Sequence, residues 1–326
     1  MQFSGRAMAE MQCNRRAFTS GMASLLLGTA LLDPARGQQL EHSSLKLGVA
    51  NKAHLYYLPV TIAERRGHFR DYGLAIAISD FEGGGQSFDA LLNSSVDIAA
   101  GAYEHVLRAH FFVLYLMARA GLAPTDVSFV GVGGGERAVN AMAAAEIDAI
   151  SNLDPLITRL QQDGTVRVVA DTRFPRVNYE IFGGTNPAAV LYAKQEFIAA
   201  NPATMQALVN AFYKTLRWIA TATTDEIVNS VPPDYFLGDR AIYVKALKAN
   251  LLVYSRTGII TRQGMDSALK MMATFDPDLK GKKIDLQTTF DARFIKRATV
   301  LFDDPTNSDL ETDDRRPEID LNRFQD

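Results

Sequence analysis

Cysteine is almost absent from this chain: one residue in 326, Cys13, close to the N-terminus. If the N-terminal segment is removed, the remaining chain can form no disulfide, present no thiolate nucleophile and build no cysteine-ligated metal site. Histidine is scarce as well, with five residues that all fall within residues 42–110. None of them completes the H-E-x-x-H pattern of a helical zinc site. We therefore predict that the chain holds no metal and no cofactor.

The chain also lacks a large excess of positive or negative charge, and it has no long apolar run. The formal net charge is −3 and the isoelectric point is near 6.0, which gives no electrostatic basis for nucleic-acid binding. The unbroken apolar run at residues 111–118 is short, whereas a helix needs about 20 apolar residues to cross a bilayer. These absences exclude a nucleic-acid-binding protein and a membrane span at this run, and they favour a soluble globular protein.

The N-terminal segment has the order of an export signal. The pair Arg15-Arg16 is followed by a weakly apolar stretch at residues 21–32 and by the small-x-small triplet at residues 35–37. An ordinary first helix is the alternative, but Pro34 ends the segment before any amphipathic period develops. We predict a signal peptide of the twin-arginine type over residues 1–37, and hence a periplasmic protein. No cysteine follows the apolar stretch, so we expect no lipid anchor.

The following chain repeats one pattern: a strand, three glycines, a helix, and a short strand opened by aspartate. The first repeat is "GLAIAISDFEGGGQSFDALLNSSVDIAAG", residues 73–101, and the second repeat is "DVSFVGVGGGERAVNAMAAAEIDAIS", residues 126–151. Strands that alternate with helices indicate an α/β class with mostly parallel sheets. Two copies of one unit suggest two similar lobes.

The repeats differ in what precedes them. A strand at residues 44–50 and a helix at 58–69 lead into the first repeat, whereas only a helix, residues 110–121, leads into the second. Immediately upstream, "YEHVLRAH" (residues 103–110) also favours a helix, and no glycine or proline separates the two. Residues 103–121 therefore either form one continuous helix or mark a join.

The rest of the chain favours helices. A helix and a strand are predicted over "SNLDPLITRLQQDGTVRVVAD", and "AAVLYAK" predicts a strand that returns to the first lobe. From Asn201-Pro202, a good helix start, the pattern is helical to about Ala298. The tail at residues 299–326 is acidic and interrupted by prolines, which predicts disorder.

Three glycines between a strand and a helix leave backbone N–H groups uncovered at the helix N-terminus, where the dipole favours an anion. A tight turn without a ligand is the alternative. The dinucleotide fingerprint fails because its third glycine would fall at Glu136, and there is neither a Walker lysine nor a nucleophile-elbow motif. We predict no catalytic residue. Ligands of open α/β sheets bind at the carboxyl ends of strands, where the candidate binding residues stand: Tyr56, Tyr57, Gly84, Gly85, Gln86, Tyr103, Glu104, Gly134, Gly135, Asn152 and Asp154.

Several stretches together resemble one known family. They are "YYLPVTIAERRGHFRDYGL", "FEGGGQSFDALLNSSVDIAAGAYEH", "DVSFVGVGGG", "EIDAISNLDPLITRLQQDG", "AAVLYAK" and "YSRTGIITRQGMDSALK". Over residues 45–298 the chain is similar to the solute-binding proteins of ABC importers for nitrate, sulfonates and taurine, and to relatives that carry thiamine pyrimidine precursors. The resemblance implies a type II periplasmic-binding-protein fold: two α/β lobes around a cleft, with a helical C-terminal part. It also implies a monomer that works with an ABC permease, and it places six of the candidates at the cleft: Tyr57, Gln86, Tyr103, Glu104, Asn152 and Asp154.

The chain departs from this family near His110–Phe111. Family members usually carry several dozen more residues there, including the first strand of the second lobe, so the resemblance implies an internal deletion and an incomplete second lobe. The predicted organisation is a signal peptide, the first part of lobe I, a truncated lobe II, the lobe I return with the C-terminal helices, and a tail. Their ranges are 1–37, 38–110, 111–185, 186–298 and 299–326.

The function implied is that of a solute-binding protein, without enzymatic activity. The ligand would be a small anionic or zwitterionic organic solute of the sulfonate, taurine or nitrate kind, held by closure of the cleft. One alternative is a pyrimidine-precursor-binding protein, or a related pyrimidine synthase that would need a reactive histidine and a lysine-bound cofactor. Another is a truncated remnant or sensor that no longer binds a solute.

Overall fold

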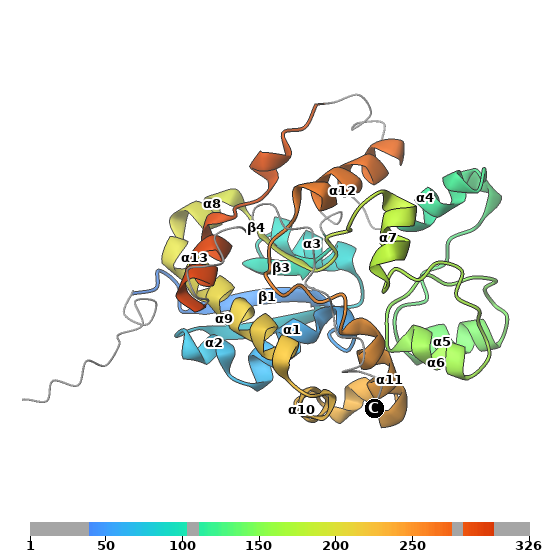
Figure 1. Ribbon diagram of the computed structural model, residues 1–326, viewed down its shortest axis with the longest axis horizontal. Coiled ribbons are helices and arrows are strands. Elements are labelled where there is room, and N and C mark those ends of the chain that lie inside the picture. The colour runs from blue at the N-terminus through green and yellow to red at the C-terminus, as the bar shows by residue number, and fades with distance from the viewer. Residues whose placement is uncertain (1–38, 103–110, 276–282, 303–326) are drawn as a thin grey trace, which may run out of the picture. The chain divides into compact units, whose positions relative to one another are not determined.

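The computed structural model describes residues 39–102, 111–275 and 283–302. Residues 38–326 form one compact unit, separate from residues 1–37, and the helices and strands of the described ranges all belong to this unit (Figure 1). Its strands are β1 (Ser44–Ala50), β2 (Ala75–Phe81), β3 (Ile98–Gly101) and β4 (Val190–Ala193). Its α-helices are α1 (Leu58–Arg65), α2 (His68–Asp71), α3 (Gly84–Leu92), α4 (Phe111–Arg119), α5 (Glu136–Ala143), α6 (Leu156–Gln162), α7 (Pro175–Phe182), α8 (Gln195–Ala200), α9 (Pro202–Thr221), α10 (Thr224–Asn229), α11 (Arg240–Asn250), α12 (Arg262–Phe275) and α13 (Arg293–Phe302). Short 3-10 turns lie at Leu55–Tyr57, Pro124–Asp126, Pro233–Phe236 and Leu286–Thr289.

The strands form one sheet in the order β2-β1-β3-β4. β1 pairs in parallel with β2 along its whole length and with β3 at Leu47 and Gly48. β4 pairs antiparallel with β3, so the chain returns to this sheet after leaving it for about 90 residues, as the sequence predicts. The predicted α/β class and the four strands are confirmed.

β1 lies between β2 and β3, and its second half, from Leu47 to Ala50, is buried on both faces. Leu45, Leu47 and Val49 are almost completely buried on one face, and the intervening residues point to the other. There Gly48 lies against α3, since a Cβ at this position would come within 2.8 Å of Ser87 Oγ. Burial on both faces is typical of a parallel strand with a neighbour on each side.

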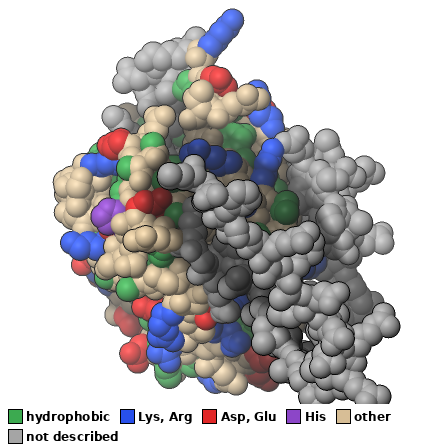
Figure 2. Space-filling view, turned by 90° about the vertical axis from the view of Figure 1, so that its left-hand side faces the viewer, with side chains coloured by type: hydrophobic (Ala, Val, Ile, Leu, Met, Phe, Trp, Pro, Cys, Tyr) green, Lys and Arg blue, Asp and Glu red, His purple; other side chains and the backbone are tan. Residues whose placement is uncertain are grey.

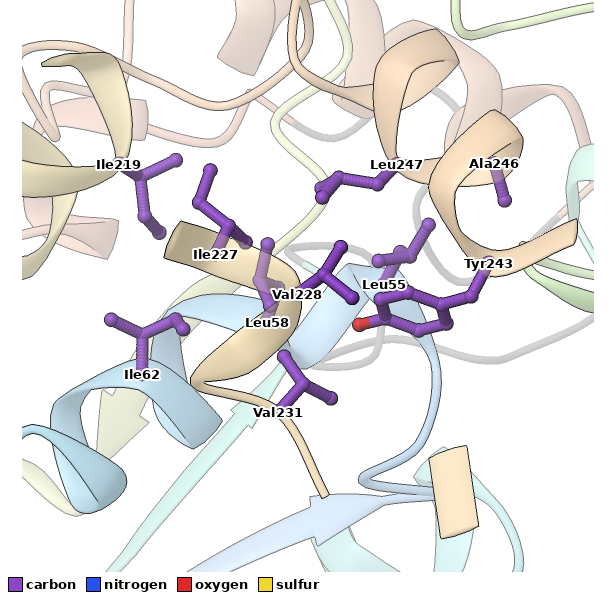
Figure 3. Close-up of a cluster of buried hydrophobic side chains, with 10 residues drawn as sticks. All are labelled: Leu55, Leu58, Ile62, Ile219, Ile227, Val228, Val231, Tyr243, Ala246 and Leu247. Carbon is purple, nitrogen blue, oxygen red and sulfur yellow. The ribbon is translucent and has the colours of Figure 1, made fainter. Parts of the chain in front are cut away.

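The helices after β4 build a second core around the start of α1 (Figure 3). Ile219 from α9, Ile227 and Val228 from α10, and Leu247 from α11 surround residues 55–62. Local signals set the helix ends: Thr223 and Glu226 form a capping box before α10, and Asp239 caps α11. The predicted helical region is confirmed and extends to Phe302, a little beyond Ala298.

The two repeats share their helix-ending geometry. Gly73 (φ 74°) ends the helical stretch before the first repeat, and Gly121 (φ 76°) ends α4 before the second. Inside the repeats, a left-handed residue follows the C-cap of each helix, Ser94 (φ 63°) after α3 and Ala145 (φ 54°) after α5, and the two residues are 51 positions apart. The N–H groups that follow donate to matching carbonyls: Ser95 to Ala90 at 2.8 Å, and Glu146 to Ala141 at 2.9 Å. The structure therefore confirms the helix of the second repeat and the way in which it ends.

Three strands predicted in the second half are wrong. Residues 127–132, 148–151 and 166–170 belong to the described part of the chain and adopt no strand there. The cause is the lack of a partner, because β2 and β3 both pair with β1 and a strand forms only when its backbone groups find a neighbour. Only residues 102–110 separate β3 from α4, too few for a helix and a further strand. The predicted deletion near His110–Phe111 itself concerns residues 103–110, which lie outside the described residues.

Charged side chains are mixed over the surface. On the face drawn in Figure 2, lysine and arginine alternate with aspartate and glutamate among the coloured atoms, in keeping with the net charge of −3. Among the helices of the described ranges, none combines the length and apolar content that crossing a bilayer requires.

Candidate functional site

The carboxyl ends of β1, β2 and β3 meet at one edge of the sheet because the three strands run in parallel. The loop at residues 51–57 follows β1, Gly83 follows β2, and Ala102 follows β3. Tyr56, Tyr57, Gly84, Gly85 and Gln86 all stand at this edge, as predicted. Tyr103 and Glu104, which continue from β3, lie outside the described residues.

The N-terminus of α3 is open toward this edge. Its N-cap residue, Gly83, has an extended backbone and offers no side chain to cap the helix. Among the described residues, none lies within 4 Å of a Cβ added at Gly83 or at Gly85. The first N–H groups of a helix have no intrahelical partner, so those of Gly84, Gly85 and Gln86 can donate to a ligand, with the positive end of the helix dipole behind them. The geometry suits an anion.

Gln86 supports this turn. Its Oε1 accepts a hydrogen bond from the backbone N–H of Glu82 at 3.1 Å, which holds the loop between β2 and α3. The side-chain NH₂ group of Gln86 can turn to a ligand and donate to it.

Aromatic side chains stand beside this edge. Tyr56 and Tyr57 form an edge-to-face pair with centroids 4.8 Å apart. Tyr57 is buried, and burial raises its pKa, with a further contribution from nearby Tyr192. Tyr56 is held in place by a hydrogen bond from its hydroxyl to the carbonyl of Ala188.

Tyr192 is a residue that the sequence did not single out. It lies on β4 opposite Ala99 and packs near Phe88 of α3, with ring centroids 6.1 Å apart. Burial raises its pKa to about 12, so the hydroxyl stays protonated and can donate a hydrogen bond. That buried hydroxyl has no hydrogen-bond partner among the residues that the structure describes.

In the second triglycine, the middle residue, Gly134, is packed against the loop after β1, whereas a Cβ added at Gly133 or Gly135 would meet no described residue within 4 Å. A Cβ at Gly134 would clash with His54 Nε2 and would lie 2.5 Å from Asn51 Nδ2. Burial lowers the pKa of His54 to about 4, partly offset by the backbone of Gly134 and the charge of Asp154. At pH 7 the imidazole of His54 is therefore uncharged, and it packs directly against Gly134.

Other contacts fix the same loop. Asn152 Nδ2 donates to the carbonyl of Gly133 at 2.8 Å. Gly135 is the N-cap of α5, and the first residue of that helix is Glu136, whose carboxylate already faces the positive helix end. Of the two triglycine turns, the one at α3 is thus better suited to an external anion.

Asp154 is buried, and hydrogen-bond donors from other residues surround its carboxylate. Its carboxylate accepts hydrogen bonds from the backbone N–H and hydroxyl of Thr158, from Arg173 Nη1 at 2.8 Å and from Asn250 Nδ2 at 2.6 Å. Its carbonyl accepts from the N–H of Leu55 at 2.9 Å. Asp154 therefore ties the second half of the chain to the loop after β1.

Charged groups near the edge are paired. Lys52 forms an ion pair with Glu64, and its backbone N–H donates to Asp80 Oδ1 at 2.9 Å. Burial raises the pKa of Asp80, partly offset by the N–H groups of Lys52 and Asn51. No cluster of three histidine, cysteine, aspartate or glutamate side chains suited to a metal occurs within the described ranges.

The structure thus brings part of the predicted set together. Tyr57, Gln86 and the glycines of α3 share one edge. Asn152 and Asp154 are connected to the same region by their hydrogen bonds with Gly133 and Leu55. Sequence reasoning missed three residues of this region: Asn51, His54 and Tyr192. Asn51 could have been noticed as a polar residue directly after a strand, whereas Tyr192 is revealed only by the pairing of β4.

A hollow of about 490 Å³ lies elsewhere, beside the start of α5, along α6 and against residues 237–239. Its charged lining includes Glu136, Asp163 and Asp239 around Arg159. Arg159 is bonded to Asp163 and to the carbonyl of Leu237, so this cation is already engaged by the protein. None of the predicted binding residues lines the hollow, although Glu136 at its edge directly follows Gly135.

Comparison with known proteins gives the family. Residues 102–231 match the NMT1-like family. A solved structure from Bordetella bronchiseptica RB50 is 35% identical, with a TM-score of 0.77, and the match covers 81% of this chain and 99% of that chain. A search of the curated proteins found no match.

Two more distant solved structures share the fold. One is the periplasmic nitrate-binding protein of Synechocystis PCC 6803: 12% identity, TM-score 0.57, covering 82% of this chain and 91% of that chain. The other is the alkanesulfonate-binding protein of Xanthomonas axonopodis pv. citri, solved with MOPS: 14% identity, TM-score 0.56, covering 80% and 99%. The resemblance predicted from the sequence is confirmed: the chain belongs to the NMT1-like family and has the periplasmic-binding-protein fold.

Proposed function

We propose that this chain is the solute-binding component of an ABC importer, exported to the periplasm by the twin-arginine route. It binds a small anionic or zwitterionic organic solute of the sulfonate, taurine or nitrate kind without chemical change. A monomer delivers this solute to a permease in the membrane. Solved neighbours named for nitrate and alkanesulfonate binding support this class of ligand.

The observation that carries the proposal is the open N-terminus of α3. Gly83 and Gly85 leave space over uncovered N–H groups at the carboxyl edge of the sheet, where ligands of open α/β sheets bind. The protonated hydroxyl of Tyr192 adds a donor near α3. These groups bind the charged end of the solute, and the rings of Tyr56 and Tyr57 cover its organic part.

The test is a pair of substitutions at Gly85. Gly85→Asp places a carboxylate in open space at the first turn of α3, where it favours the helix by about 0.3–1 kcal/mol but repels an anion. We expect it to weaken anion binding by about tenfold or more, equal to about 1.4 kcal/mol, in calorimetric titrations with nitrate, taurine, an alkanesulfonate and an aminopyrimidine. Gly85→Asn, which has the same shape without the charge, is the matched control. Equal affinities of the two variants for the bound anion would show that α3 does not hold it.

Tyr192→Phe provides a second, independent change. It removes one hydroxyl that lacks a protein partner among the described residues, so the folded state should lose little. If the hydroxyl binds the solute, affinity falls by about tenfold or more, since a hydrogen bond to a charged group contributes about 1.5–3 kcal/mol and each 1.4 kcal/mol is about tenfold. Preference for the aminopyrimidine over every anion would instead support the pyrimidine-precursor alternative.

A further inference from the structure

A group of basic side chains lies where the end of α1 and the helices α2 and α9 meet. We call it the basic corner: Arg66, the C-cap of α1, Arg70 of α2, and Lys214 and Arg217 of α9. α2 packs against α9 (Figure 1), and Lys214 joins the two helices through an ion pair with Asp71 at 2.7 Å. Lys214 and Arg217 are three positions apart, so they share one face of α9.

Two cations of the basic corner, Arg66 and Arg70, are exposed, and neither forms an ion pair within the ranges that the structure describes. The guanidinium of Arg66 stacks on Trp218, with its Cζ 4.0 Å from the ring centroid. The guanidinium of Arg70 folds back toward Arg66 over Gly67, since a Cβ at Gly67 would lie 2.8 Å from Arg70 Nη2. Neighbouring positive charges repel each other, so this corner favours an anionic group.

The carboxylates that stand beside the basic corner do not neutralise it. Asp71 is paired with Lys214. Glu226 lies near Arg66, but its carboxylate accepts hydrogen bonds from the N–H and the hydroxyl of Thr223. Four cations against these two carboxylates leave an excess of two positive charges. The buried His68 responds to this field: burial lowers its pKa to about 4, the charges of Lys214 and Arg66 contribute to the decrease, and Asp71 opposes it.

The last described helix, α13, ends beside this corner. Its final residue, Phe302, packs on both helices of the corner: its ring centroid lies 6.3 Å from that of Tyr72, the C-cap of α2, and 5.7 Å from that of Tyr213 of α9. Tyr213 directly precedes Lys214, and Trp218 follows five residues later, about 7.5 Å along the helix axis. The chain therefore continues from Phe302 at a point close to the basic corner.

The segment that follows Phe302 carries the complementary charge. Residues 303–326 include nine aspartate and glutamate residues and three arginine residues, which gives a net charge of −6. An extended chain spans about 3.3 Å per residue, so even the part up to Thr312 is long enough to pass the whole corner. The composition of the segment predicts no folded core of its own, and pairing between charges does not require one.

We propose that the acidic segment, residues 303–326, binds to the basic corner of its own molecule. Its carboxylates pair with Arg66 and Arg70, beside the ring of Trp218, and shield this surface from other anionic partners. The place where the segment begins favours it over a second copy or a separate acidic peptide. A short flexible tether gives a segment an effective concentration in the millimolar range, which a separate molecule would have to exceed.

The experiment places a contact quencher of fluorescence in the acidic segment of the full chain. Cys13→Ser removes the natural thiol, Thr312→Cys supplies a new one for a disulfide-linked nitroxide, and Trp218 is the only tryptophan. In an unbound segment, residue 312 would lie on average about 17 Å from Phe302. We expect the nitroxide to quench Trp218 by about half or more, relative to the same sample after a reductant has released the label. Most of this quenching should disappear in 1 M NaCl, where the Debye length is about 3 Å.

Two pairs of substitutions locate the contact. Arg66→Gln with Arg70→Gln should reduce the quenching at least about twofold, whereas Arg176→Gln with Arg262→Gln, which removes the same charge from α7 and α12, should leave it unchanged.

Three results would overturn the proposal. They are the absence of quenching, quenching that persists equally in 1 M NaCl and in both double variants, and quenching of unlabelled chains by a labelled chain that also carries Trp218→Phe. The last of these would assign the acidic segment to the corner of a second copy. None of the residues changed belongs to the proposed solute site at α3, so each result leaves the proposed function untouched.

Discussion

Asp154 is a single buried charge on which several distant segments converge. Its partners lie on α6, before α7 and at the end of α11, and its backbone carbonyl holds the loop after β1. The side chain of Asp154 is 2% exposed and that of Arg173 is 18% exposed. Without Asp154, Arg173 would keep its ion pair with Asp171, but the buried donors of Thr158 and Asn250 would lose their acceptor, and each unsatisfied buried donor costs about 1–3 kcal/mol.

Removing this carboxylate should therefore destabilise the protein strongly. For Asp154→Ala we expect the free energy of unfolding to fall by about 3–5 kcal/mol in urea titrations. Asp163→Asn breaks a partly exposed ion pair with Arg159 and should cost no more than about 1 kcal/mol. Equal losses in the two variants would contradict the structural role of Asp154.

Two buried histidines give the folded state a pH dependence. Burial lowers the pKa of His54 to about 4, and burial together with the charge of Lys214 lowers the pKa of His68 to about 4. Both values lie below the roughly 6.5 of an unfolded chain. Between pH 6.5 and 4 the unfolded state binds more protons, so stability is complete above this window and falls as the pH decreases through it.

The expected slope is at most about 1.4 kcal/mol per pH unit for each histidine, measured by urea unfolding at pH 7, 6 and 5. His68→Gln keeps a polar group beside Thr215, the present partner of His68 Nδ1, and should remove about half of the slope. His42→Gln changes an exposed histidine and should not alter it. A slope that survives both His54→Gln and His68→Gln would point to other groups.

At the scale of elements, the two triglycine turns have become different. Gly85 in the turn at α3 has no described residue within 4 Å of an added Cβ, whereas Gly134 in the turn before α5 lies against His54 and Asn51. Gly134→Ala should cost about 1–3 kcal/mol of unfolding free energy, as overpacking generally does. Gly85→Ala, with free space around its Cβ, should change stability little or raise it slightly, because it removes a glycine from a helix. Thermal unfolding of the pair checks this, and similar losses in both would contradict the asymmetry.

The elements that the sequence predicted well are those that local pattern decides. β1 is marked by its apolar residues Leu45, Leu47 and Val49, and α9 by Asn201-Pro202 followed by helical periodicity. The strands expected at residues 127–132, 148–151 and 166–170 have equally suitable local patterns and still do not form, because a strand depends on a partner that lies elsewhere in the chain. Val169, which the sequence places in a buried strand, is instead 90% exposed.

The residues of the candidate site were likewise predictable only where the local sequence pattern decides their position. Residues placed by strand ends, such as Tyr57 and Gln86, could be named from the sequence, because parallel strands end at one edge. The contact of Gly134 with His54 could not be named, since it depends on how one loop packs on another. The hydrogen bonds that Arg173 and Asn250 donate to Asp154 could not be predicted either, because these partners lie 19 and 96 residues away in the sequence.

At the scale of the whole molecule, the second half of the chain lacks the buried strands that the sequence predicts at residues 127–132, 148–151 and 166–170. A buried strand contributes about four apolar side chains at roughly 1.5–3 kcal/mol each, and a whole domain is stable by about 5–15 kcal/mol. The second half is held by its small core between α5 and α6, by the packing of α4 and α7 on α12 around Tyr115, Phe182 and Met265, and by its ties to the loop after β1 at Gly134 and Asp154.

The central claim is that this chain still binds a small anionic solute. The most direct measurement is thermal unfolding of residues 38–326, alone and with saturating nitrate, taurine, an alkanesulfonate or an aminopyrimidine. A ligand that binds the folded state at a hundredfold excess over its Kd adds about 2.7 kcal/mol, so one of the anions should raise the Tm of a single cooperative transition by several degrees. A broad transition that no ligand shifts would contradict the claim and mark the chain as a family member that has lost its solute site.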